Sequence, residues 1–554
     1  MENLLTNRNI QLSFVGFVLF IMFLGNSSLT LWDNAESQTA LIAQQIVETG
    51  NGKILFSNFF DALKAHPLQV FETVLSYQIF GINEFSTRLP SILYIILTFV
   101  ALIYFTHKIY NEKTAILAAV ILGSTFGVVG FAKINLAESG LIFYETVMVL
   151  ALWVHFKTPN WKYLAAFWIS MALSFFQGGF VAVFPIVTAV GILFFIKKDW
   201  QPKIKAIKPW LLGVILLPLV AYLIMTFAVK TLAPQEVFQN VFLENKGSLN
   251  FGRQTMLLIV CFLPWLAFLP TALVRLTKQI IKKEDEALYF GAVLVFGWLI
   301  YEIVPTSMSL PSAMIYPILA ILISKRFLEY EAACNRFDNL PINQHVEVRV
   351  KKANFKDENL IKTVQLLGVI LVFGLMFVLS MISYSQGVGI LKASFVGMIL
   401  WITSFIVAIG LYSRNAKLIL MNATIGGILT MFFGWLLIVP IIEPARSVAY
   451  RTATQITKIA KEQPVILYTE TPYNLPSLPF YLNQNKVNYT FTNDYDKLMK
   501  SYLNNDSTTL IVDEFTFKTM KATVTEGKYK AEKLEAVEGI LFTEFKSGNY
   551  WIVK

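Results

Sequence analysis

The feature that most constrains this chain is its succession of long apolar segments. Many of them reach the ~20 residues that an α-helix needs to cross the hydrocarbon core of a bilayer. Of the 554 residues, 55% are hydrophobic and only 15% are charged, whereas soluble domains are about a quarter charged. This composition excludes a disordered chain, a collagen-like chain and a disulfide scaffold. The sequence therefore predicts a mainly α-helical, polytopic membrane protein.

The apolar windows predict about thirteen membrane spans. Several are short or are split by a Gly or a Pro, so the count is set to within one or two. The predicted spans are 11–31, 86–106, 113–130, 139–156, 163–177, 179–196, 209–229, 254–275, 287–304, 310–324, 363–384, 389–411 and 418–440.

Basic residues occur in alternate loops and predict the orientation of the chain, because positive loops stay in the cytoplasm. The N-terminus is therefore expected in the cytoplasm of a cytoplasmic (inner) membrane protein, and an odd number of spans places the C-terminus outside. The same rule explains the net charge of +10 without a nucleic-acid partner. The basic residues are His107, Lys108, Lys113, Lys157, Lys162, Lys197, Lys198, Lys203, Lys205, Lys208, Arg275, Lys278, Lys282, Lys283, Lys325, Arg326, Arg414 and Lys417.

The composition also predicts two domains, a transmembrane domain over 1–442 and an extracytoplasmic α/β domain over 443–554. In the second, PVILYTE, VNYTFT, TTLIVDE and GNYWIVK have the pattern of short strands, and helical stretches near 450–462 and 494–504 alternate with them. The first external loop covers 32–85. Its helix ESQTALIAQQIVE is expected to lie at the membrane interface, and PLQVFETVLSYQIFG to lie in the outer leaflet.

Acidic residues stand at the predicted outer boundary, where they are costly unless they are used. Asp33 and Glu36 follow the first span and are three residues apart, so both carboxylates could face one site. The same pattern is typical of a capping box, with Asp33 or Asn34 as N-cap and Glu36 as its partner. Glu138 is expected at the same membrane face, either as a site residue or as a loop residue neutralised by Lys133.

Two further groups could bind ligands at the outer face, Arg88 at the start of the second span and His66 in the first external loop. Arg88 would contact lipid headgroups or hold a lipid phosphate, and His66, which precedes Pro67, is either a polar ligand group or a surface residue. The four histidines have no metal-ligand spacing. P-loop, dinucleotide, GxSxG and Cys/His motifs are absent. Any chemistry must rest on carboxylates and basic groups at the outer leaflet.

Four stretches, LWDNAESQTALIAQQIVETG, HPL, FGINEFSTRLPSIL and AKINLAE, resemble in this order the lipid-linked sugar transferases of the GT-C class. The similar branch contains aminoarabinose transferases and protein mannosyltransferases. The resemblance is specific over 28–145 and architectural beyond it. It implies a GT-C fold, a polyprenyl-phosphate sugar as donor substrate, and a cavity between the first external loop and the membrane where donor and acceptor meet.

The resemblance also assigns roles to residues. It implies Glu36, Asp33 and Glu138 as catalytic carboxylates, and Arg88, Lys133 and His66 as donor-phosphate groups. Three positions depart from the family pattern: Ala35 replaces the first acid, Ala65 a basic residue and Gln177 a lysine. No nucleotide cofactor is needed, because the donor carries its activation in the phosphate ester. The sequence assigns no metal ligands and leaves a divalent metal open.

Two functions compete. The first is an inverting transferase, in which a carboxylate accepts the proton of an acceptor hydroxyl that attacks the anomeric carbon. The second is a catalytically degenerate GT-C scaffold that binds envelope proteins as an assembly subunit. A transporter would need polar residues at mid-span, and few are present. Membrane lipids are partners in either case.

The orientation predicts that residues 443–554 face the outside. A cysteine placed at Asn505 should react with a membrane-impermeant thiol reagent in intact spheroplasts. If the cysteine is labelled only after lysis, the predicted topology is wrong.

Overall fold

The computed structural model describes residues 8–32, 36–50, 66–213, 251–302, 310–341, 345–385, 390–440, 443, 447–459, 464–468, 476–504, 509–513, 516, 518–520, 533–537, 540–541, 546–547 and 550–553. Asp33, Ala35, Ala65 and most of the predicted span 209–229 lie outside these ranges. The chain forms two compact units. The helical unit comprises Met1–Leu24, Ser91–Lys133 and Ala137–Leu437, and the mixed unit Gly25–Pro90, Ile134–Leu136 and Ile438–Lys554.

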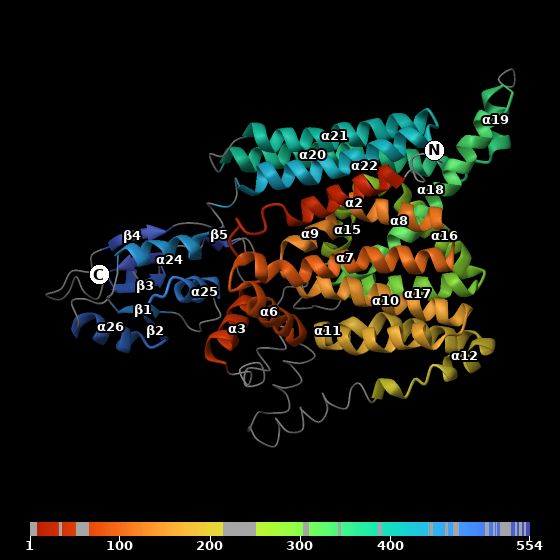
Figure 1. Cartoon of the computed structure of the whole chain (residues 1–554). Helices are drawn as coiled ribbons and strands as arrows, with labels where there is room; N and C mark the ends of the chain where they lie inside the picture. The colour runs from red at the N-terminus through yellow and green to blue at the C-terminus, as the bar shows by residue number, and fades with distance from the viewer. Residues whose placement is uncertain are drawn as a thin grey trace. The chain divides into compact units, whose positions relative to one another are not determined.

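The helical unit is built from long apolar helices joined by short turns (Figure 1). The chain passes from the mixed unit into the helical unit within α7. Its elements are α2 (Arg8–Phe23), α7 (Glu84–Ile109), α8 (Glu112–Ser124), α9 (Phe126–Gly130), η1 (Phe131–Lys133), α10 (Ala137–Lys157), α11 (Trp161–Ile196), η2 (Lys198–Trp200), α12 (Gln201–Ala206), α15 (Arg253–Cys261), η3 (Trp265–Phe268), α16 (Leu269–Ile281), α17 (Asp285–Trp298), η4 (Leu299–Glu302), η5 (Pro311–Ile315), α18 (Tyr316–Asp338), α19 (Val346–Ala353), α20 (Glu358–Ser385), α21 (Ile390–Tyr412), α22 (Ala416–Phe433) and η6 (Gly434–Ile438).

Six of the described helices are long and apolar enough to cross a membrane, and counting each bent helix pair as one span raises the number to eight. The chain is therefore a multi-pass membrane protein, and the count of thirteen remains a prediction. Helix α10 is a core helix, since 89% of its apolar window is buried, whereas only 22% of the window of α20 is buried. Lipid must cover most of the apolar surface of α20.

Polar residues in the predicted loops start three of these helices. The side chains of Asn111, Asn160 and Asn415 accept hydrogen bonds from the first-turn N–H groups of α8, α11 and α22, as N-caps do. The predicted spans 163–177 and 179–196 form one element, α11, which breaks at Gly179. That residue has φ 62°, a left-handed conformation that favours glycine.

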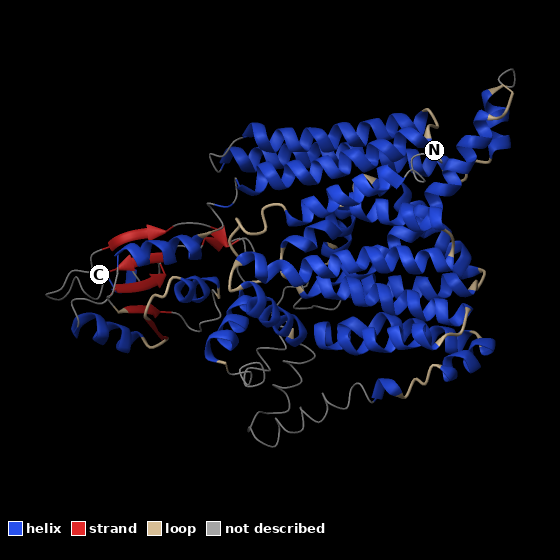
Figure 2. Cartoon of the chain, viewed as in Figure 1, coloured by secondary structure: helices blue, strands red, loops and turns tan. Residues whose placement is uncertain are grey.

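The mixed unit combines the first external loop with the C-terminal part of the chain, a division that differs from the predicted boundary at 442. Its strands form two sheets (Figure 2). Its helices are α3 (Ser37–Thr49), α6 (Pro67–Phe80), α24 (Val448–Ile459), α25 (Ser477–Gln484) and α26 (Tyr495–Asn504). Its strands are β1 (Val465–Tyr468), β2 (Tyr489–Thr492), β3 (Thr509–Asp513), β4 (Lys533–Val537), β5 (Ile540–Leu541), β6 (Lys546–Ser547) and β7 (Tyr550–Val553).

The five-stranded sheet has the order β2-β1-β3-β7-β4. Strands β2 and β3 are parallel to β1, with Val465 paired to Tyr489 and to Thr509. Strand β7 is antiparallel to β3 and β4. Parallel neighbours need a crossover connection, and here α25 and α26 lie in the two connections. The four predicted strands correspond to β1, β2, β3 and β7, and the predicted α/β class of this part is confirmed.

The core of the mixed unit joins elements that are far apart in sequence. Leu41 and Ile42 of α3 are fully buried in one apolar cluster with Val70 of α6, Tyr481 of α25 and Ile511 of β3. The expectation that this face of α3 lies at the membrane interface is therefore wrong, because protein covers it. Helix α6 keeps an exposed apolar stripe of Phe71, Leu75 and Ile79, as the predicted position in the outer leaflet requires.

Helices α20, α21 and α22 lie side by side (Figure 1), and glycine allows α22 to approach α8 closely. A Cβ on Gly427 would lie 2.3 Å from the carbonyl oxygen of Ser124. We expect Gly427→Ala to lower the free energy of unfolding by about 1–3 kcal/mol, because a backbone atom must move. Thermal unfolding of the purified protein measures this.

The matched control is Gly374→Ala on α20, where a Cβ meets no atom within 4 Å. This variant should be neutral or slightly more stable, since Ala is the better helix former. Equal stability of both variants would contradict the close packing of α22 on α8.

Candidate active site

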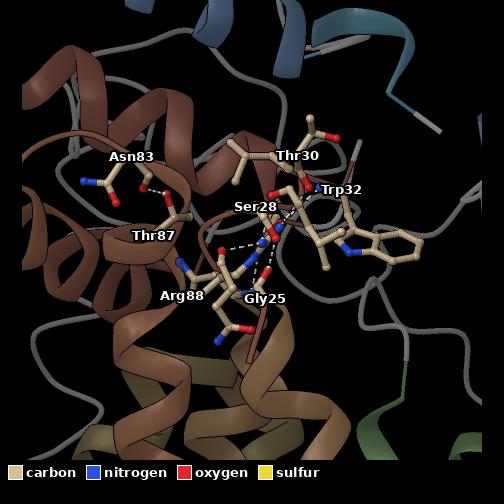
Figure 3. Close-up of polar contacts among 12 residues, drawn as sticks. Gly25, Ser28, Thr30, Trp32, Asn83, Thr87 and Arg88 are labelled. Carbon is tan, nitrogen blue, oxygen red and sulfur yellow. Dashed lines mark hydrogen bonds and ion pairs between the residues drawn. The ribbon is translucent and has the colours of Figure 1, made fainter. Parts of the chain in front are cut away.

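The centre of the mixed unit's polar interior is Arg88, whose side chain is fully buried. Its guanidinium lies within the turn of chain that precedes α3, close to Gly25, Ser28 and Thr30 (Figure 3). Nη1 donates to the carbonyl oxygens of Asn26 and Leu29 at 2.8 and 2.9 Å, and Nη2 donates to that of Thr30 at 2.8 Å. The first turn of α7 therefore holds the segment that leaves the first span.

Glu36 supplies the countercharge. Nε of Arg88 donates to both Glu36 carboxylate oxygens at 3.2 Å, and Nη2 also donates to Oε1. Glu36 is itself fully buried and accepts from the backbone N–H of Trp32 at 3.1 Å and of Asn135 at 2.8 Å. Every N–H of the guanidinium is thus bonded, and both carboxylate oxygens accept several donors.

This geometry changes what the two residues can do. A donor phosphate could bind Arg88 only by displacing one of the acceptors that it already holds, so the structure does not support the expected phosphate contact. In the same way, a general base needs a lone pair open to the acceptor hydroxyl, and Glu36 directs its oxygens to Arg88, Trp32 and Asn135. The pair as described fixes the loop.

The C-terminal part of the chain also holds this loop. The carboxylate of Glu443 accepts from the N–H and the hydroxyl of Thr30 at 2.9 and 2.7 Å. The N–H of Leu31 donates to the Tyr481 hydroxyl at 2.7 Å. Burial raises the pKa of Tyr481 well above its usual value, so the phenol stays neutral. Residues more than 400 positions apart in sequence thus position the start of the acidic motif.

The segment between η1 and α10 joins the same network through Asn135. Its side-chain N–H₂ donates to the Thr73 hydroxyl at 2.9 Å, and its backbone oxygen accepts from Gln69 at 2.7 Å. Because its own N–H donates to Glu36, Asn135 connects α6 to the Arg88 pair. Sequence reasoning missed Asn135, Glu443 and Tyr481; only their polarity within apolar surroundings marks them.

The remaining predicted residues lie elsewhere. In the helical unit, buried Lys133 donates to the carbonyl of Leu24 at 2.6 Å and lies 4.8 Å from the centre of the Trp435 ring. Glu138, also buried, accepts from the N–H of Leu310 at 3.0 Å. Gln177 donates to Ala137 at 3.3 Å, beside Glu138 at the start of α10.

His66 is half-buried in the mixed unit and has a positive φ of 52° just before Pro67, which begins α6. Asp33 lies outside the described residues. Within the described ranges, His, Cys, Asp and Glu side chains form no group of three or more that could hold a metal ion.

Comparisons with known proteins bear on this fold. The family model of dolichyl-phosphate-mannose-protein mannosyltransferases matches residues 65–225. The crystal structure of ArnT from Cupriavidus metallidurans bound to undecaprenyl phosphate matches with a TM-score of 0.68 and 14% identity, over 98% of this chain and 97% of that one. The structure of apo ArnT matches with a TM-score of 0.67 over the same shares.

An uncharacterized protein of Aquifex aeolicus is 24% identical over 335 residues, which are 58% of this chain and 74% of that protein. The two ArnT structures confirm the mainly helical GT-C fold with its small sheet. The resemblance to GT-C lipid-linked glycosyltransferases that the sequence indicated is confirmed as well.

Removing the charge of Arg88 tests the buried pair. Arg88→Met leaves Glu36 buried without a cation, so we expect the free energy of unfolding to fall by about 3–5 kcal/mol. Arg88→Lys should not restore it, because an ammonium cannot satisfy the acceptors of a planar guanidinium. Denaturant unfolding of the purified protein measures both variants, with exposed Lys497→Met in the same unit as control.

Adding Glu36→Leu to Arg88→Met should cost less than the sum of the two single changes, because no isolated buried charge remains. An Arg88→Met protein as stable as the parent would show that the pair does not hold the loop.

Proposed function

We propose that this chain transfers a sugar from a polyprenyl-phosphate-linked donor to an acceptor at the outer face of the cytoplasmic membrane. The observation that carries the proposal is the match of nearly the whole chain to ArnT, a protein whose structure contains undecaprenyl phosphate. The mannosyltransferase family model over 65–225 supports sugar transfer, and that stretch contains His66, Arg88, Lys133 and Glu138.

The proposed reaction is inverting and needs no nucleotide. The acceptor hydroxyl attacks the anomeric carbon, and a carboxylate accepts the proton of that hydroxyl. The bond between the anomeric carbon and the phosphate oxygen breaks, and the lipid phosphate leaves with its electron pair. A cation near the leaving phosphate lowers the barrier because it stabilises the charge that develops there. We assign Lys133 and His66 to the phosphate.

The carboxylates divide into two roles under this proposal. Glu36 lies in the candidate site but is engaged by Arg88 and by two backbone N–H groups, so we assign it the positioning of the acidic loop. Asp33, three residues earlier in that loop, and Glu138 at the start of α10 are then the carboxylates proposed to accept the proton.

The test is a transfer assay with the purified protein in liposomes, using a panel of polyprenyl-phosphate sugars. Asp33→Asn or Glu138→Gln should lower kcat by about a hundredfold or more, the usual effect of losing a general base, without changing the temperature of unfolding. Glu36→Gln should lower stability and activity together. Glu48→Gln, an exposed carboxylate on α3, is the matched control.

Full activity of both the Asp33 and Glu138 variants would remove these residues from the mechanism. A protein that binds polyprenyl phosphate but transfers none of the sugars, with or without Ala35→Asp, would favour the scaffold function instead.

A further inference from the structure

A second polar region of the helical unit lies away from the residues assigned above. A cavity of about 240 Å³ is lined by α16, α18 and the segment that follows α19. We call this cavity the basic pocket. Its charged lining residues are Arg275, Arg326, Arg336, Lys356 and Glu329. A smaller cavity of about 180 Å³ shares Arg275 and Arg326 and is also lined by Lys325, Glu284 and Glu286. Lys325 and Glu286 form an ion pair there at 2.7 Å.

The charges in the basic pocket do not balance. Four cations face one carboxylate, and Arg275 and Arg326 share that carboxylate, Glu329. The acids that follow in the chain are already paired. Asp357 pairs with Lys278 at 3.7 Å, and Glu358 pairs with Lys362 and Arg414 at 2.5 and 3.0 Å. Among the described residues the pocket therefore keeps an excess of three positive charges.

Arg326 shows that the pocket is not merely a solvated basic surface. Its side chain is only 4% exposed. One terminal nitrogen donates to the carbonyl of Lys356 and the other to Glu329. Its Nε has no hydrogen-bond partner in the described part of the chain. A buried N–H without an acceptor is costly, and an anionic oxygen in the cavity would satisfy it if the Arg326 side chain turned toward the cavity that it lines.

The two cations at the rim of the pocket are accessible, and a hydrogen bond orients one of them. Arg336 and Lys356 are exposed, and the Nε of Arg336 donates to the carbonyl of Ala353 at 3.2 Å, which directs the guanidinium along the segment after α19. Guanidinium groups bind phosphate oxygens in pairs. A phosphate entering between α18 and this segment would meet Arg336 and Lys356 first and Arg326 at its base.

We propose that the basic pocket binds the phosphate of an anionic phospholipid headgroup. The pocket lies at the end of the helices that the basic loops assign to the cytoplasm, and basic pockets between spans on that side bind anionic headgroups. Apolar side chains next to it are open to lipid, since Val274 is 37% exposed and Ile281 is 74% exposed. A lipid can therefore bring its phosphate and its acyl chains together, which free phosphate cannot.

The test is binding to the full-length purified protein after lipid removal, measured by native mass spectrometry and by thermal shift. Phosphatidylglycerol should bind and raise the unfolding temperature, whereas zwitterionic phosphatidylcholine should bind at least tenfold more weakly. Arg336→Gln and Lys356→Gln, both at exposed positions, should each weaken phosphatidylglycerol binding by about fivefold to tenfold. Lys162→Gln, an exposed cation outside the pocket, should not change it.

Equal binding of the two lipids, or pocket variants that behave like Lys162→Gln, would overturn the proposal. A parallel measurement with inorganic phosphate distinguishes a lipid headgroup from a free phosphate ion as the ligand. If it stabilises the protein as much as phosphatidylglycerol does, and Arg336→Gln removes that effect, the site takes a free anion and the lipid assignment is wrong. None of these outcomes depends on sugar transfer.

Discussion

A guanidinium removed from water must place every N–H on an acceptor. Arg88 meets this requirement by bonding to acceptors from several segments of the chain. Three backbone carbonyls and the carboxylate of Glu36 converge on it. Glu36 in turn accepts from Asn135, which precedes α10. A buried ion pair contributes little net stability, but breaking it costs several kcal/mol. The segments before α3 and before α10 are therefore held by a pair from which neither partner can be removed without a large loss of stability.

The same pair explains how an acidic motif can be present without every acid taking part in chemistry. Glu36 is the member of the motif that matches the family pattern, yet its bonds are those of an anchor. Under the proposed transfer reaction this makes Asp33 and Glu138 the carboxylates to test, and it gives Arg88 a positioning role. A rigid scaffold beneath a reactive loop is how precise sites are usually built.

The charged residues of the helical unit are arranged differently from the Arg88–Glu36 pair. Several cations at its predicted cytoplasmic end pair with carboxylates, as Lys197 does with Asp285 at 2.7 Å and Lys325 with Glu286 at 2.7 Å. In the basic pocket, by contrast, the cations outnumber the single carboxylate. The bilayer supplies anions at this depth, so an excess that would destabilise a soluble protein can be satisfied by lipid.

The sequence by itself determined the membrane class, the GT-C resemblance and the four strands β1, β2, β3 and β7, because apolar length and alternation act locally. It also singled out Arg88 and Glu36. Only the tertiary structure decided that these two bind each other, that Leu41 and Ile42 face protein rather than lipid, and that Glu443 and Tyr481 hold the loop that begins α3. Those outcomes depend on contacts across hundreds of residues, and no local pattern encodes which partner a buried polar or apolar group will find.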